Sequence, residues 1–129
     1  MANVLVVDDD RTIRMILSEI LTTEGYTVKT AEHGGPALDI LRASQERLVV
    51  LLGLVMPYVD GQEVLEAVAM DEALASRHAI VMVTAQVQAA QTGRIAELRK
   101  QLDVPLIAKP FTVKEILSAV ETSSARLDE

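Results

Sequence analysis

Short apolar runs alternate along the chain with longer segments in which apolar residues recur every three or four positions. The runs have the length of strands and lie at Val4–Val7, Thr27–Ala31, Leu48–Leu52, Ala79–Val83 and Leu106–Ala108. The first, third and fourth runs are continuously apolar, which is typical of strands covered on both faces. The second run alternates with polar residues and the fifth follows Pro105, so both are predicted at the edges of a sheet.

The segments between these runs have the period of amphipathic helices. Their apolar stripes are Ile13, Ile16, Leu17, Ile20 and Leu21; Leu38 and Leu41; Val64, Leu65 and Val68; Ile95, Leu98 and Leu102; and Ile116, Leu117 and Val120. Pro36 suits a first helical turn, Gly25 a helix end, and Thr112 with Glu115 a capping box. The alternation predicts an α/β fold, one doubly wound domain over residues 1–129 with helices on both faces of a parallel sheet.

The composition excludes several classes of function. Without cysteine there is no disulfide, thiol nucleophile or thiolate metal site. The net charge of -7 argues against nucleic acid and anionic membranes as partners, because both require a basic surface. The apolar stretch 48–54 is too short to span a bilayer, and three aspartates near the N-terminus do not suit a signal peptide. A cytoplasmic protein is therefore expected.

Polar residues stand directly after three of the predicted strands. Asp8, Asp9 and Asp10 follow the first strand, Thr84 ends the fourth, and Lys109 follows the fifth. Doubly wound folds bind ligands at the carboxyl ends of their strands. Crowded carboxylates need a neutralising cation, and oxygen ligands suit Mg²⁺, although Asp10 is expected mainly to cap the next helix. An acidic pair, a hydroxyl and a lysine at one sheet edge predict a phosphoryl site.

These residues and two turns resemble the receiver domains of response regulators in two-component phosphorelay signalling. The matching motifs stand in family order over essentially the whole chain: Val6-Val7-Asp8-Asp9, Ala31-x-x-Gly34-x-x-Ala37-Leu38, Met56-Pro57-x-x-Asp60-Gly61, Thr84-Ala85 and Lys109-Pro110-Phe111. The resemblance implies a flavodoxin-like five-stranded parallel sheet in the order 2-1-3-4-5.

The resemblance also implies roles for individual residues. Asp8, Asp9 and the main-chain carbonyl of Val55 would bind Mg²⁺, while Thr84 and Lys109 would contact the phosphoryl group. Expected partners are a histidine kinase or a downstream effector. They would bind the surface of the fourth helix, fifth strand and fifth helix of a monomer or weak dimer.

Two positions depart from the family pattern. Gly53 stands where the family has the aspartate that accepts phosphate, and glycine has no carboxylate to form an acyl phosphate. Leu106 stands where signalling receivers usually have Tyr or Phe, the ring that reports phosphorylation. The sequence therefore predicts a stand-alone pseudo-receiver without an output domain. It would not be an enzyme, would bind Mg²⁺ weakly or not at all, and would act through protein contacts.

A phosphatase is the alternative interpretation. Asp8-x-Asp10-x-Thr12 after an apolar strand also matches the opening motif of haloacid-dehalogenase-like enzymes, whose first aspartate is a nucleophile assisted by Mg²⁺. That family's late acidic pair and cap domain have no counterpart in the sequence.

Three further residues are expected to have no chemical role. Asp60 is interpreted as a turn residue bonded to backbone amides. His33 and His78 are interpreted as surface residues near loops.

Overall fold

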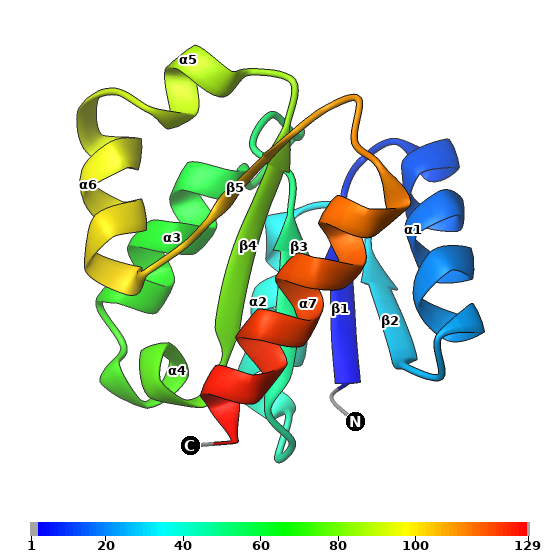
Figure 1. The fold of residues 1–129 in the computed structure, drawn as a ribbon. Coiled ribbons are helices and arrows are strands. Elements are labelled where there is room, and N and C mark those ends of the chain that lie inside the picture. The colour runs from blue at the N-terminus through cyan, green and yellow to red at the C-terminus, as the bar shows by residue number, and fades with distance from the viewer. Residues whose placement is uncertain (1–2, 129) are drawn as a thin grey trace.

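A five-stranded parallel sheet with helices on both faces forms the computed structural model, which describes residues 3–128 (Figure 1). The strands are β1 (Asn3–Val7), β2 (Thr27–Ala31), β3 (Leu48–Leu52), β4 (Ala79–Thr84) and β5 (Leu106–Ala108). The helices are α1 (Arg11–Thr23), α2 (Gly34–Ala43), α3 (Gly61–Ala69), α4 (Glu72–Arg77), α5 (Val87–Ala90), α6 (Gly93–Leu102) and α7 (Val113–Leu127).

The strand order is β2-β1-β3-β4-β5, which confirms the predicted topology and places β2 and β5 at the edges. In register, Val7 of β1 lies beside Ala31 of β2 and Leu52 of β3, so these three strands end together. Every residue of β3 and β4 is buried, as their continuous apolar runs predict. The carboxyl ends of the strands therefore form one edge on which loop residues gather.

Two hydrophobic layers cover the sheet (Figure 1). On one face α1 and α7 bury Leu17, Leu21, Ile116 and Val120. On the other face lie α2, α3, α4 and α6. They pack against the strand side chains that point to this face, which alternate along each strand with those pointing to the first face. The short helices α4 and α5 are additions that the sequence pattern did not predict.

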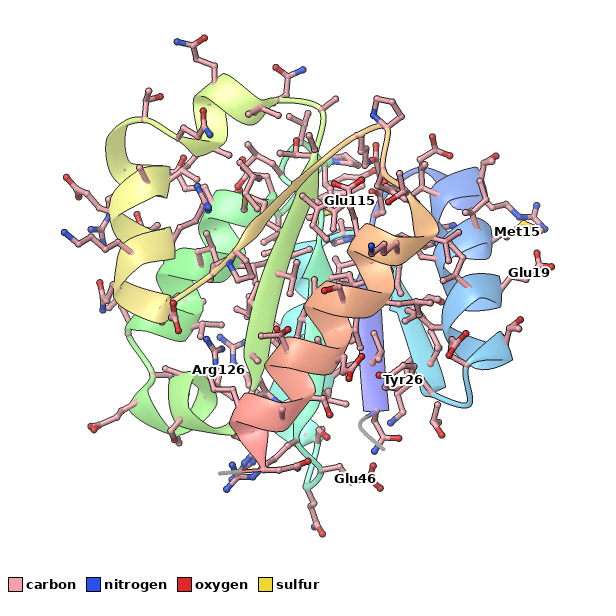
Figure 2. The ribbon with its side chains drawn as sticks, in the orientation of Figure 1. Met15, Glu19, Tyr26, Glu46, Glu115 and Arg126 are labelled. Atoms are coloured by element: carbon pink, nitrogen blue, oxygen red, sulfur yellow. The ribbon has the colours of Figure 1, made fainter. Side chains whose placement is uncertain are left out.

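Capping side chains fix where the loops after β1, β3 and β5 turn into helices. Asp10 accepts from the backbone amides of Thr12 and Ile13 at the start of α1. Asp60 forms a capping box with Glu63, which confirms its interpretation as a turn residue bonded to backbone. The predicted capping box at the start of α7 is also present, with Glu115 at its third position (Figure 2).

The interpretation of His78 as a surface residue is wrong. Its ring is 5% exposed and lies between the start of β3 and the end of α2. Nδ1 accepts from the backbone amide of Leu48 (3.1 Å), and Nε2 lies 3.0 Å from the carbonyl oxygen of Leu41. Both contacts are buried, so the ring satisfies two backbone groups that water does not reach. Among the described residues, no helix is long and apolar enough to cross a bilayer.

Candidate functional site

The strand ends bring together most of the residues that the sequence singles out. Asp8 follows β1, and Gly53 follows β3 with its amide donating to the carbonyl oxygen of Val7 (2.8 Å). From the other side, the amide of Lys109 donates to the carbonyl oxygen of Thr84 (3.0 Å). The predicted convergence of Asp8, Gly53, Thr84 and Lys109 at one edge is therefore present.

An ion pair occupies the centre of this edge. Lys109 Nζ lies 2.7 Å from Asp8 Oδ2, and the Asp8 side chain is only 5% exposed. The other oxygen of Asp8 accepts from the backbone amide of Asp10 (2.9 Å). A buried carboxylate needs such partners because water no longer solvates it. The ammonium group of Lys109 thus neutralises Asp8.

Arg14 supports this arrangement and was not singled out by the sequence. Its Nη1 donates to the carbonyl oxygen of Asp8 (2.7 Å), and its Nη2 lies 3.8 Å from Glu32. A basic residue one turn into α1 carries no motif that would identify this contact. The contact fixes the backbone of the β1–α1 turn.

Gly53 lies directly against the ion pair and the end of β1. A Cβ atom at Gly53 would lie 3.3 Å from Asp8 Oδ2 and 3.3 Å from the carbonyl oxygen of Val7. These contacts are tight but need a shift of only a few tenths of an ångström. The φ angle of Gly53 lies outside the left-handed region, so the backbone would accept an L-residue. Nothing in the backbone therefore requires glycine here.

Thr84 is the last residue of β4, and Leu106 is the first residue of the neighbouring strand β5. Thr84 is buried, and its Oγ1 accepts from the backbone amide of Gln86 (3.0 Å). Leu106 of β5 is half-buried and packs against the hydrophobic layer that contains α6. The side chain of Leu106 is aliphatic and carries no hydroxyl or ring.

The oxygen donors that could hold a metal at this edge are Asp8, Asp9 and the main-chain carbonyl of Val55. Asp9 and Val55 are exposed at this edge, whereas Asp8 is already paired with Lys109. Within residues 3–128, no three Asp, Glu or His side chains gather in a way that could hold a metal ion. Asp8, Asp9 and the Val55 carbonyl have the oxygen chemistry that suits Mg²⁺, but Gly53 adds no ligand and Lys109 competes for Asp8.

Asp10 does not share this site. Its carboxylate Oδ1 accepts from the amides of Thr12 (2.8 Å) and Ile13 (3.4 Å), as expected of a helix cap. The phosphatase alternative needs Asp10 as an acid or base beside Asp8. Its use as a cap gives that alternative no support.

The fold and this edge match a known family of signalling domains. The family model for the response regulator receiver domain matches residues 4–121. The chain belongs to the response regulator receiver family. Receiver domains are modules of two-component signalling and generally not enzymes, and they bind Mg²⁺ at an acidic pocket.

Curated relatives and solved structures agree with this assignment. Sporulation initiation phosphotransferase F of Bacillus subtilis is 34% identical, covering 92% of this chain and 90% of that protein. Probable transcriptional regulator ycf27 of Porphyra purpurea is 36% identical over 98% of this chain. The chain spans about half the length of this and several other curated relatives.

Two solved receivers cover nearly the whole chain. A CheY-like receiver domain protein from Methanospirillum hungatei superposes with a TM-score of 0.82 at 29% identity, covering 99% of this chain and 98% of its own. The response regulator TrrA of Thermotoga maritima, solved in complex with Mg²⁺ and BeF, gives a TM-score of 0.76 at 28% identity. That match covers 95% of this chain and 98% of TrrA.

Proposed function

We propose that this receiver is a protein-binding module of a two-component system that is not phosphorylated at the usual position. The observation that carries the proposal is the Lys109–Asp8 ion pair beside Gly53. The phosphoryl acceptor is missing, and the lysine that would contact a phosphoryl group is bound to the carboxylate that would hold Mg²⁺. The signal must then depend on the amount or location of the protein and not on its phosphorylation.

The proposed partner surface consists of α6, β5 and α7, which correspond to the predicted fourth helix, fifth strand and fifth helix. A cleft between α6 and α7 is lined by Arg99, Lys100, Asp103, Pro105, Thr122 and Arg126, among others. Arg126 lies on the α7 side of this surface and pairs with Asp103 at 2.6 Å (Figure 2). A histidine kinase or an effector with acidic and polar side chains would fit the cleft.

The contacts of three side chains support a single predominant conformation of this surface. Thr84 holds the first residues after β4 through Gln86. Arg94 pairs with Glu66 of α3 at 2.7 Å. Arg99 donates to the carbonyl oxygens of Ala90 (2.9 Å) and Val104 (3.2 Å), one on each side of α6. A ligand shifts the equilibrium between two conformations only by its difference in affinity for them. Because no phosphoryl group can be attached at position 53, the surface stays in one conformation and binds its partner constitutively.

We expect Mg²⁺ to bind weakly to the unmodified protein. Lys109 neutralises Asp8, and only Asp9 and a backbone carbonyl remain as free protein ligands. Isothermal titration should therefore detect little binding at millimolar Mg²⁺, whereas Lys109→Met should bind more tightly because Asp8 becomes available. Tight binding by the unmodified chain would show that the ammonium group yields to the metal.

The relay from the site to the partner surface should be broken at Leu106. With Mg²⁺ and beryllofluoride, Gly53→Asp is expected to shift amide resonances in the 84–91 loop but only weakly in β5 and α7. The double variant Gly53→Asp/Leu106→Tyr should extend the shifts into β5 and α7, because a ring can follow the movement of Thr84. Large shifts there in the Gly53→Asp protein alone would refute the role assigned to Leu106.

A further inference from the structure

Tyr58 has an unusual position for its size. It lies in the β3–α3 loop with φ of 65°, and 86% of it is exposed. The left-handed conformation is unfavourable for an L-residue with a Cβ atom, and Gly or Asn normally occupies it. A mostly exposed ring recovers little of this cost through burial. The stability of the fold therefore does not account for a tyrosine at position 58.

The ring of Tyr58 is nevertheless held in place. Its centroid lies 5.1 Å from that of His33 in a tilted arrangement. His33 is fixed in turn, because its Nδ1 accepts from the backbone amide of Gly35 (3.0 Å). The amide of Gly34 donates to the carbonyl oxygen of Val59 (2.8 Å), which ties the two loops together. An exposed ring held in this way loses little entropy when a partner contacts it.

The surroundings of this ring are acidic. We call His33, Val55 and Tyr58 the rim patch; Val55 is 68% exposed. The loops of the rim patch follow β2 and β3, and Asp9 follows β1, which lies between those strands. The Glu32 side chain, next to His33, is 78% exposed, and the whole chain carries a net charge of -7.

The basic groups nearby do not cancel this charge. Arg14 faces Glu32, but it is 14% exposed and its shorter contact is with the carbonyl oxygen of Asp8. Lys109 is bound to Asp8. Asp60, two residues after Tyr58, is engaged with backbone in its capping box and still carries its negative charge. Arg11, two residues after Asp9, is also exposed, but the carboxylates of Asp9, Glu32 and Asp60 outnumber it around the rim patch.

We propose that the rim patch binds an arginine-bearing segment of a partner protein, laid across the strand ends beside Gly53. A guanidinium group stacks on an aromatic face and pairs with carboxylates at its edge, whereas an ammonium group stacks less well. A second copy of this chain is a poor occupant, because two chains of charge -7 repel each other. The inference rests on the proposed action through protein contacts and places one contact on a surface separate from α6, β5 and α7.

The test uses nona-arginine and nona-lysine as probes, with binding followed by amide resonances of the full chain. Tyr58→Asn should weaken nona-arginine binding by about two- to fivefold and remove the preference for arginine over lysine. Tyr58→Phe should retain both, because it keeps the ring. Met70→Asn is the matched control, since Met70 is 89% exposed and lies at the end of α3 away from the strand ends.

Stability measurements separate a binding role from a structural one. Tyr58→Asn should leave the melting temperature unchanged or raise it, since Asn tolerates the left-handed conformation. A clear fall in melting temperature, an equal loss of affinity in Met70→Asn, or resonance shifts that avoid His33, Val55 and Tyr58 would each overturn the inference. None of these outcomes bears on the relay through Leu106, so the proposed function is tested separately.

Discussion

Replacing Gly53 by aspartate is expected to convert a protein that acetyl phosphate leaves unmodified into one that gains a single labile phosphoryl group. The other members of the site are in place: Asp8 and Lys109 lie beside position 53, and Thr84 ends the neighbouring strand. A Cβ atom at Gly53 would lie 3.3 Å from Asp8 Oδ2 and from the carbonyl oxygen of Val7, so a side chain there requires these neighbours to move by a few tenths of an ångström. Aspartate there would add the missing nucleophile and a carboxylate for Mg²⁺.

Intact-mass spectrometry with acetyl phosphate and Mg²⁺ measures this directly. Gly53→Asn is the matched control, because its side chain has the same size and cannot form an acyl phosphate. Removal of Mg²⁺ should abolish labelling of Gly53→Asp, since two adjacent carboxylates then repel each other and the phosphate. If the unmodified chain or Gly53→Asn is labelled, another residue accepts phosphate and the proposed function is wrong.

His78→Ala should lower the free energy of unfolding by about 3–5 kcal/mol, a large share of the stability of an ordinary domain. The substitution leaves a cavity and removes the partners of two buried backbone groups, the amide of Leu48 and the carbonyl of Leu41. Urea unfolding of both proteins at neutral pH gives the difference. His33→Ala is the matched control, because that ring is only partly buried and caps a single amide. A loss similar to that of His33→Ala would contradict the structural role of His78.

The same ring should make stability depend on pH. Burial lowers the pKa of His78, the charge of Arg77 acts in the same direction, and the hydrogen bond to Leu41 opposes them. In the unfolded chain the imidazole titrates near its usual value of about 6.5. Between that value and the lower folded pKa, the unfolded state binds more protons, so stability is complete above about pH 6.5 and falls as the pH drops below it. His78→Ala should lack this part of the pH dependence.

The apolar pattern predicted the architecture because both faces of this sheet are covered. A continuous run such as Leu48–Leu52 is buried throughout, and the interrupted runs of β2 and β5 lie at the edges. Helices α4 and α5 were missed because six and four residues are too few to show a helical period. The burial of His78 was missed for a different reason. The groups that need its ring belong to Leu41 and Leu48, and no local pattern links them to position 78.

The sequence predicted the members of the site and that Lys109 could pair with the acidic turn, but not which aspartate it binds. The order of the motifs predicted that the site residues lie at the strand ends. Only the structure shows that Lys109 pairs with Asp8 and leaves Asp9 exposed. The role of Arg14 was not predicted because its side chain donates to a backbone carbonyl oxygen. Every residue has such a carbonyl, so no residue type marks this partner in the sequence. The tight surroundings of Gly53 likewise depend on how β1 and β3 approach each other.

The most direct measurement of the central claim is a pair of amide-resolved NMR spectra of the unmodified protein, without and with Mg²⁺ and beryllofluoride. The segment to follow runs from Thr84 through α6 and β5 into α7. One sharp set of resonances is expected in this segment, at the same positions in both spectra. Concerted shifts on addition of beryllofluoride, or exchange broadening before it, would contradict a single constitutive conformation, because the partner surface would then switch without an aspartate at position 53.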